Sequence, residues 1–315
     1  MNKKTNTSSL LQIKSIMLFI GLVLSSTQLM AADAKLLMKS SFDGVSVSTS
    51  NIWKQDFIGT DSVTGYTWPK DLPGDTPRNF FNYVINDYNN YLAFADAKVV
   101  DTTGYDGKST KALYIEYKKD DPTHVSLSRS QYVMWGLGSS SDPVERLDQG
   151  YVKYRIKAHI NGTMDWWMPI EWKQEGETYR VGLYAYKVDT STPYWYLKGE
   201  VGTLGGGTDW AVENHDVPVP QDEWYTLECF WVGDTDPAKG RMKIAINGQV
   251  IFDVRNRTKN TDNMYYFSPF KIYGSVGHSW ITDFEMWDMP PVTSILSDNY
   301  QQAKGSFVIS PGELK

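Results

Sequence analysis

The sequence has almost no cysteine, and few histidines. Cys229 is the single cysteine among 315 residues, so an internal disulfide is excluded. It alternates with Leu227 and Trp231 in "TLECFWV", which predicts a buried, inert thiol rather than a nucleophile. The four histidines are scattered along the chain, and none belongs to a His/Cys group with the spacing of a zinc site.

The sequence also lacks a surplus of positive charge. Its formal net charge is −6, and removing residues 1–34 takes away three lysines and one aspartate, which lowers the charge by two units to −8. A nucleic-acid partner is therefore not expected, because such partners require a basic surface. A local basic strip could still serve an acidic ligand.

The chain has one apolar run near its start and no later stretch long enough to span a bilayer. Three lysines precede that run, residues 16–24, and "ADA" at residues 32–34 fits an A-x-A cleavage site. We expect residues 1–34 to be a signal peptide, because the run is short for a transmembrane helix. The mature protein is then secreted or periplasmic and free of the membrane; an uncleaved anchor is the alternative.

Aromatic residues and turn signals are abundant. The chain contains 12 Trp and 20 Tyr, and segments such as "YDGK", "ING" and "GDTDPAKG" separate short runs of alternating polarity. In residues 151–160, Val152, Tyr154 and Ile156 share one face, and basic residues share the other. This pattern predicts an all-β, two-sheet antiparallel sandwich.

Four further segments point to a known fold. "EWYTLECFWV" leads to "RMKIAINGQVIFDV", in which Asn247-Gly248 predicts a tight hairpin, and "LLMKSSFDG" and "SWITDFEMWDMPP" have the character of a first and a closing strand. Together they resemble the concanavalin A-like jelly-roll superfamily, which includes lectins, glycoside hydrolases and polysaccharide lyases of the alginate lyase and heparin lyase I type. The resemblance implies one jelly-roll domain at residues 35–291, followed by a loosely ordered C-terminal tail at 292–315.

Strand alternation in residues 164–201 predicts a mixed aromatic and charged face. Met168, Ile170 and Trp172 alternate with the opposite set. The side chains predicted to share the open face are Trp167, Glu171, Lys173, Arg180, Tyr184, Tyr186, Tyr194, Tyr196, Lys198 and Glu200. Aromatic rings beside charged groups suit sugar rings with their hydroxyl edges. The alternative is a solvated face held by cross-strand ion pairs.

The resemblance to lyases implies β-elimination on a uronic-acid polysaccharide. This chemistry needs a cation to neutralise the substrate carboxylate, a base for the C5 proton and an acid for the leaving oxygen. We predict Arg180 as the neutralising group and Tyr184 or Tyr186 as base and acid, with Lys173 lowering the pKa of the tyrosine. The full set of predicted catalytic residues is Arg180, Tyr184, Lys173, Glu171, Arg129, Gln131 and His215. The predicted substrate-binding residues are Trp167, Tyr186, Tyr194, Tyr196, Lys198 and Glu200. The signature motifs of common alginate lyases are absent from the sequence.

Two other functions remain open. A glycoside hydrolase would need a carboxylate pair, for which Glu171 and Glu200 are candidates. A non-catalytic, lectin-like module would use the same aromatic face. No cofactor is required for the chemistry, but Asp43 and Asp283 are candidates for a structural Ca²⁺ site, because hard oxygen ligands suit that ion. We expect a monomer whose partner is a polysaccharide.

Overall fold

The protein is described by a computed structural model that defines most of the region between Ala34 and Asp298. The described residues are 34–48, 57–68, 82–83, 95–119, 129–135, 149–160, 166–174, 179–187, 192–201, 207–233, 239–255 and 264–298. The predicted signal peptide lies outside them. Within these segments the secondary structure consists of strands alone, and none of them supplies a helix able to cross a membrane. The all-β prediction is therefore confirmed.

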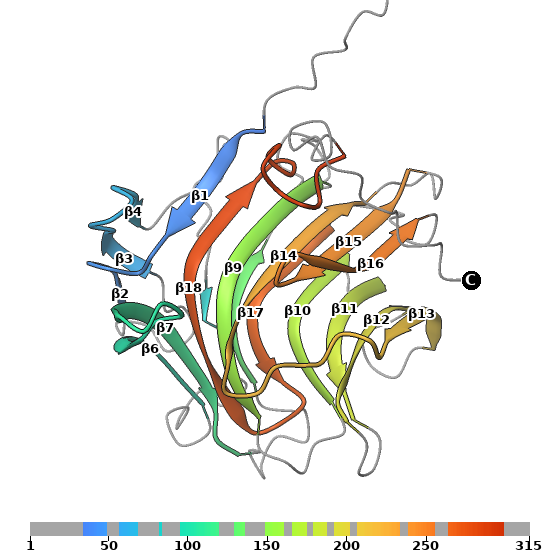
Figure 1. The fold of residues 1–315 in the computed structure, drawn as a ribbon, viewed down its shortest axis with the longest axis horizontal. Coiled ribbons are helices and arrows are strands. Elements are labelled where there is room, and N and C mark those ends of the chain that lie inside the picture. Colours follow the sequence, from blue (N-terminus) through green and yellow to red (C-terminus); the bar gives the residue numbers. More distant parts are fainter. Residues whose placement is uncertain are drawn as a thin grey trace, which may run out of the picture. The chain divides into compact units, whose positions relative to one another are not determined.

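The strands form two large antiparallel sheets and one small one (Figure 1). The eight-stranded sheet has the order β16-β15-β14-β9-β18-β7-β6, with β1 also paired to β18. Its strands are β1 (Leu36–Ser40), β6 (Ala95–Thr103), β7 (Ser109–Tyr117), β9 (Gln149–Ile160), β14 (Trp224–Val232), β15 (Arg241–Ile246), β16 (Gln249–Arg255) and β18 (Gly277–Trp287). The predicted hairpin joins β15 to β16, and Asn247 and Gly248 have the positive φ values, 50° and 75°, that a tight turn requires.

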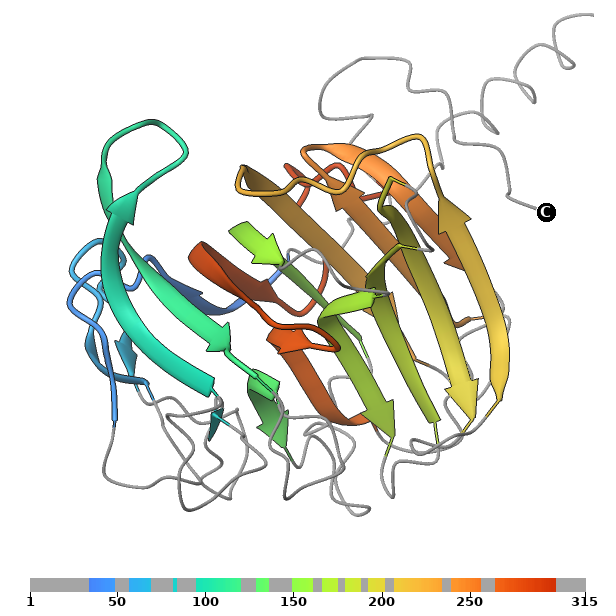
Figure 2. The ribbon, with the colours of Figure 1, turned by 90° about the horizontal axis from the view of Figure 1, so that it is seen from below.

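The seven-stranded sheet has the order β13-β12-β11-β10-β17-β8-β5. Its strands are β5 (Asn82–Tyr83), β8 (Arg129–Trp135), β10 (Trp166–Gln174), β11 (Tyr179–Tyr186), β12 (Tyr194–Val201), β13 (Thr208–Asn214) and β17 (Met264–Tyr273). Strands β10 to β12 lie side by side in Figure 2. The small sheet consists of β2 (Ser46–Val47), β3 (Phe57–Thr60) and β4 (Thr67–Trp68).

The two large sheets enclose one hydrophobic core. Aromatic contacts cross between them: the Trp231 ring of β14 lies 5.7 Å from that of Trp172 and 4.7 Å from that of Phe267. The Tyr154 hydroxyl of β9 donates a hydrogen bond to the Pro269 carbonyl of β17, at 2.6 Å. Cys229 is fully buried in this core, and burial raises the pKa of its thiol, as expected for an inert residue. The two-sheet antiparallel sandwich confirms the predicted fold class.

A bulge in β10 changes which residues face the core. The register with β11 pairs Trp167 with Ala185 and Ile170 with Leu183, so one extra residue of β10 lies between these pairs. Trp167 is therefore buried in the core with Ile170, at 0% exposure. The prediction that Trp167 shares the open face with Glu171 is wrong, because unbroken alternation does not hold across the bulge. Trp166 lies on that face instead.

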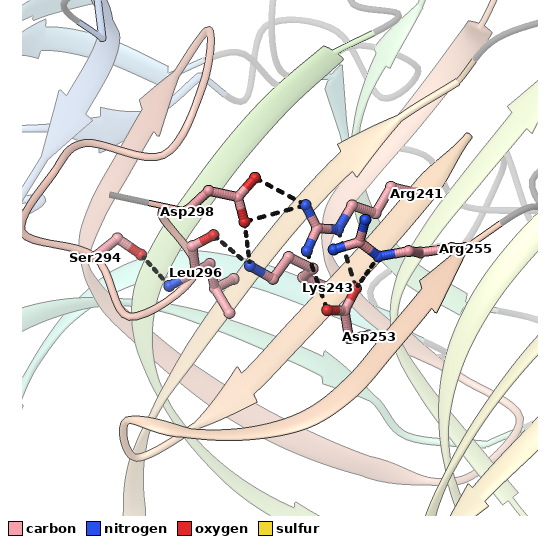
Figure 3. Close-up of polar contacts among 7 residues, drawn as sticks. All are labelled: Arg241, Lys243, Asp253, Arg255, Ser294, Leu296 and Asp298. Atoms are coloured by element: carbon pink, nitrogen blue, oxygen red, sulfur yellow. Dashed lines mark hydrogen bonds and ion pairs between the residues drawn. The ribbon is translucent and has the colours of Figure 1, made fainter. Parts of the chain in front are cut away.

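The segment after β18 packs on the outer face of the eight-stranded sheet, the face turned away from the core. Leu296 is 1% exposed and clusters with Tyr151, Phe230 and Ala245. Figure 3 shows the accompanying polar contacts: Lys243 donates to the Leu296 carbonyl at 2.8 Å, and further contacts join Asp298 to Arg241 and Lys243. The expectation of a loosely ordered tail is thus wrong for residues 292–298, which are anchored by apolar and charged groups.

Candidate functional site

A buried carboxylate organises the open face of the seven-stranded sheet. Glu171, on β10, is 0% exposed and forms an ion pair with Lys271 of β17. Its carboxylate also lies 4.0 Å from the Lys173 ammonium and 3.6 Å from the Arg180 guanidinium. Burial by itself raises the pKa of Glu171, but these three cations outweigh it and lower the pKa to about 2. Glu171 is therefore ionised at neutral pH and fixes three cations around itself.

A second carboxylate extends this arrangement to β12. Glu200 accepts a hydrogen bond from Arg180 Nε, lies 2.8 Å from the Lys198 ammonium and accepts a hydrogen bond from the Tyr184 hydroxyl at 3.1 Å. Burial acts to raise the pKa of Glu200, yet hydrogen bonds and charge from Arg180 and Lys198 lower it overall. Arg180 thus bridges both carboxylates, and the predicted ion pairing across the strands is present.

The charges of this cluster do not cancel. Among the described residues, four cations, Lys173, Arg180, Lys198 and Lys271, surround two carboxylates, Glu171 and Glu200, which leaves two positive charges in excess within this group. The chain as a whole has a formal net charge of −6. We call these six residues the cationic cluster. A local positive excess on an acidic protein favours an acidic ligand at this face.

A series of aromatic rings lies beside the cationic cluster. The ring centre of Trp166, on β10, lies 5.1 Å from that of Tyr273 and 5.6 Å from that of Tyr184. The ring centre of Tyr196, on β12, lies 6.2 Å from that of Tyr184. The series continues through Tyr186 and Tyr194 and ends at His215, which stacks on Tyr194 at 4.1 Å. We call this the aromatic series: Tyr273, Trp166, Tyr184, Tyr196, Tyr186, Tyr194 and His215. Most of its rings are partly exposed, so they offer flat surfaces to a ligand.

Gly274 positions Trp166. This residue follows β17 with φ of 98°, and a Cβ there would lie 2.4 Å from the ring atoms of Trp166. The indole therefore packs directly against the glycine backbone, which only glycine allows at this φ. The Ser275 hydroxyl donates to the Trp166 carbonyl at 3.1 Å. These contacts hold Trp166 at the rim of the cationic cluster.

Tyr184 is a protonated hydrogen-bond donor. It is 2% exposed, and burial raises its pKa strongly; Arg180 opposes this rise, whereas Glu200 and Glu171 add to it. The prediction of a lowered pKa for this tyrosine is wrong, because burial and the two carboxylates dominate, and the cation that opposes them is Arg180. The Lys198 ammonium lies 4.7 Å from the centre of the Tyr184 ring. Tyr184 can donate a proton, but it does not serve as a resting-state base.

The structure brings most of the predicted residues together. Glu171, Lys173, Arg180, Tyr184, Lys198 and Glu200 share one network, and Tyr186, Tyr194 and Tyr196 lie beside it. His215 is exposed and its Nε2 lies 2.9 Å from Glu213. The backbone register places Gln131 opposite Lys271 and Arg129 opposite Tyr273, but the side chains of these two predicted residues are not described.

Lys271, Tyr273 and Trp166 were not predicted. The Lys271 ammonium lies 4.5 Å from the centre of the Tyr273 ring and contributes to the cationic cluster. The alternation of Lys271 and Tyr273 in "FKIYG" was a usable signal, since both residues fall on one face of a strand. A register shift between Phe267 and Phe270 obscures that phase when the whole segment is read as one regular strand.

The two aspartates predicted to bind calcium have different partners. Asp43 accepts a hydrogen bond from the Ser62 hydroxyl, and Asp283 lies 3.0 Å from Arg155. The described segments contain no group of three or more His, Cys, Asp or Glu residues arranged to hold a metal ion. A calcium site made of this pair would need oxygen ligands of other types as well.

The fold and the site define a class of protein: an all-β sandwich with a cationic, aromatic face. No protein-family model matches the chain, and no curated protein matches it in sequence. Solved structures do resemble it. A mutant of alginate lyase Aly36B in complex with alginate trisaccharide is 11% identical, with 65% of this chain and 87% of that chain covered and a TM-score of 0.41.

Two other solved structures represent the two kinds of neighbour. Alginate lyase A1-II', of polysaccharide lyase family 7, is 15% identical, with 59% of this chain and 82% of that chain covered and a TM-score of 0.38. The metal-free carbohydrate recognition domain of Emp46p is 9% identical, with coverages of 65% and 93% and a TM-score of 0.37. These neighbours are alginate lyases and a carbohydrate recognition domain. The likeness concerns the fold alone.

Proposed function

We propose that this protein is a secreted polysaccharide lyase that cleaves a uronic-acid-containing chain on the open face of its seven-stranded sheet. The observation that carries this proposal is the positive excess of the cationic cluster, placed directly beside the aromatic series. Sugar rings would lie on the aromatic rings, and a uronate carboxylate would be held by the cationic cluster.

Arg180 and Lys198 are the neutralising groups in this proposal. Both are less buried than Lys271. Each pairs with Glu200, and both could bind a substrate carboxylate at the same time. Neutralising that carboxylate makes the C5 proton of the sugar more acidic, since the charge that develops on its removal is stabilised. Glu171 keeps Arg180 in place but does not itself react.

We assign the role of the acid to Tyr184 because its hydroxyl is protonated and lies beside Arg180 and Glu200; its raised pKa means that it gives up the proton only to a strongly basic oxygen, such as the departing alkoxide. In the elimination a base removes the C5 proton, the electrons form the C4–C5 double bond, and the bond to the leaving oxygen breaks. Tyr184 gives that oxygen its proton and is later reprotonated from solvent. Tyr186 is the candidate for the base; His215 stacks on Tyr194, four residues along β12 from Lys198, and is therefore too distant to take the C5 proton of a uronate held at Arg180 and Lys198.

The carboxylate chemistry of a glycoside hydrolase fits this site less well. Such an enzyme needs a carboxylic acid that keeps its proton, which usually requires a raised pKa. Here the pKa values of both Glu171 and Glu200 are lowered by the surrounding cations. A lectin-like module is the better second candidate, because the aromatic series could bind a glycan without any proton transfer.

The test is to mix the purified protein with polymannuronate, polyguluronate, polygalacturonate and a neutral glucan. Ultraviolet absorbance of the new double bond and reducing ends are recorded together. We expect both signals to rise with at least one polyuronate, and Tyr184→Phe to abolish both. Tyr66→Phe is the matched control, because it removes a hydroxyl that donates to the Leu37 carbonyl at 2.7 Å, outside the seven-stranded sheet. New reducing ends without a rise in absorbance would refute the lyase. If neither signal rises but the protein is retained on a column that carries the polysaccharide, the lectin-like function remains.

Export is part of the same proposal. Cleavage near Ala34 would release a chain that begins just before β1, whose first residue is Leu36. The N-terminal sequence of protein recovered from an expressing culture checks it. The calcium site at Asp43 and Asp283 also stays a prediction, tested by whether added Ca²⁺ raises the melting temperature and whether Asp283→Asn removes that effect.

A further inference from the structure

A second aromatic and basic surface lies on the outer face of the eight-stranded sheet, on the opposite side of the core from the site described above. The backbone register places five residues of five neighbouring strands in one row across this face. We call it the outer-face row: Lys98, Tyr114, Trp280, Lys157 and Trp224. Residues directly opposite each other in neighbouring strands point to the same side, so these side chains form a continuous line.

The rings of this row are held in place but remain partly exposed. Tyr114 lies 5.5 Å from Trp280, and the Lys157 ammonium lies 5.2 Å from the centre of the Trp280 ring. The Trp224 indole donates a hydrogen bond to the Thr103 carbonyl, at 2.9 Å. None of these aromatic residues belongs to the core, and each retains solvent contact. Single exposed rings are common, but a line of neighbouring exposed rings indicates an interaction or ligand site.

A cavity adjoins Trp224 at the end of the row. Its volume is about 430 Å³, and Trp224, Arg155, Tyr105, Thr226 and Asn247 line it together with Asp222, Glu223 and Tyr225. The Arg155 guanidinium lies 3.1 Å from the centre of the Tyr105 ring, which is 54% exposed. The cavity thus combines aromatic faces with hydrogen-bonding groups, as sugar sites do.

The charges of the outer face single out Lys157. Along β9, Lys153 lies 3.6 Å from Glu228 and Arg155 lies 3.0 Å from Asp283. No carboxylate within the described part of the chain pairs with Lys157, which lies between Trp280 and Trp224. These two tryptophans are two strands apart, about 9 to 10 Å, which a disaccharide unit of an extended chain can bridge. An alternation of ring, cation and ring matches a chain whose sugars carry carboxylates.

We propose that the outer-face row and the adjoining cavity form a second, non-catalytic binding site for a uronic-acid polysaccharide. Sugar rings stack on Trp280 and Trp224, and a uronate carboxylate lies at Lys157. Among the described residues, the anchored segment 292–298 packs on the other end of the same face, against Tyr151 and Phe230, and the row lies apart from it. The site goes beyond the proposed lyase activity, because it requires binding and no proton transfer.

Affinity electrophoresis through gels that contain polymannuronate tests this site. We expect Trp224→Ala and Lys157→Gln each to weaken retention about five-fold, the loss of one stacking or charged contact, and the double variant to weaken it more. Lys111→Gln is the matched control: it removes one positive charge from the same sheet, where Lys111 pairs with Asp101 at 2.8 Å. Melting temperatures close to that of the unchanged protein confirm that each variant is folded.

Three results would overturn the second site. The first is retention of the double variant equal to that of the unchanged protein. The second is a loss of retention for Lys111→Gln as large as that for Lys157→Gln. The third is an equally large loss of retention in gels that contain a neutral glucan, which would show that no carboxylate is recognised. Cleavage of a short trimannuronate should be unaffected by the outer-face variants. Retention that depends on Trp224 and Lys157 in a protein that never forms the double bond would refute the lyase and leave this site standing.

Discussion

Replacing Glu171 by glutamine should destabilise the protein strongly, because it leaves buried cations without their anion. Lys271 and Glu171 are both fully buried, and Lys173 and Arg180 share the same carboxylate. Breaking a buried ion pair by removing one partner costs about 3 to 5 kcal/mol. We expect the free energy of unfolding of Glu171→Gln at neutral pH to fall by about that amount. Urea denaturation measures it.

The pH dependence of this stability gives an independent check. The pKa of Glu171 is about 2 in the folded protein, against 4.5 as its ordinary value. The unfolded chain therefore takes up the proton first as the pH falls, so the stabilisation is complete above pH 5 and is lost as the pH approaches 2. The difference between the two pKa values corresponds to about 3 kcal/mol. The Glu171→Gln variant should lack this part of the acid destabilisation.

Other carboxylates also titrate in this range, so the comparison between variants decides the matter. Glu213→Gln is the control, because Glu213 is exposed and pairs with His215 alone in the described contacts; its replacement should change stability by at most about 1 kcal/mol. A Glu171→Gln protein as stable as the control, with the same slope between pH 5 and pH 2, would refute the reasoning. It would mean that solvent reaches Lys271 and Glu171.

Three further predictions concern packing. Trp167→Ala should lower the free energy of unfolding by about 3 to 5 kcal/mol in urea denaturation, because Trp167 is a large core residue. Trp166→Ala should lower it by less and should weaken polysaccharide binding by about 1 kcal/mol. A larger loss of stability for Trp166→Ala than for Trp167→Ala would refute the bulge in β10. Leu296→Ala should lower the free energy of unfolding by about 2 kcal/mol and expose residues 292–298 to proteases, and an unchanged digestion pattern would contradict their anchoring. Cys229 should react with a thiol reagent only after unfolding, because it is fully buried; rapid labelling of the native protein would contradict this.

Strand alternation predicted the faces wherever the strands are regular. In β11 and β12 it placed Arg180, Tyr184 and Glu200 on the open face, opposite Leu183 and Leu197 in the core. The turn signal at Asn247-Gly248 likewise predicted the hairpin, because few residues accept positive φ. Local rules suffice for such features, since each depends on neighbours within one or two strands.

Alternation failed where the backbone departs from it. One extra residue in β10 moved Trp167 from the open face to the core, and a register shift in β17 hid the contribution of Lys271. The pKa of Tyr184 was also outside the reach of the sequence. Its rise depends on burial and on Glu200, a residue of the neighbouring strand whose distance no spacing reveals. Long-range contacts and bulges therefore limit this kind of prediction more than residue chemistry does.

The burial of Glu171 bears on how the site would treat an acidic ligand. A carboxylate with no solvent contact cannot swing away, so Lys271, Lys173 and Arg180 stay in place whether or not a ligand is bound. Glu200 neutralises only part of the remaining charge, which leaves two positive charges in excess among the described residues of the cationic cluster. Under the proposed function, an incoming uronate would meet cations that need no rearrangement, because folding has already positioned them. For the same reason, replacing Glu171 should lower the stability of the protein directly, whereas it should lower turnover only through the position of Arg180.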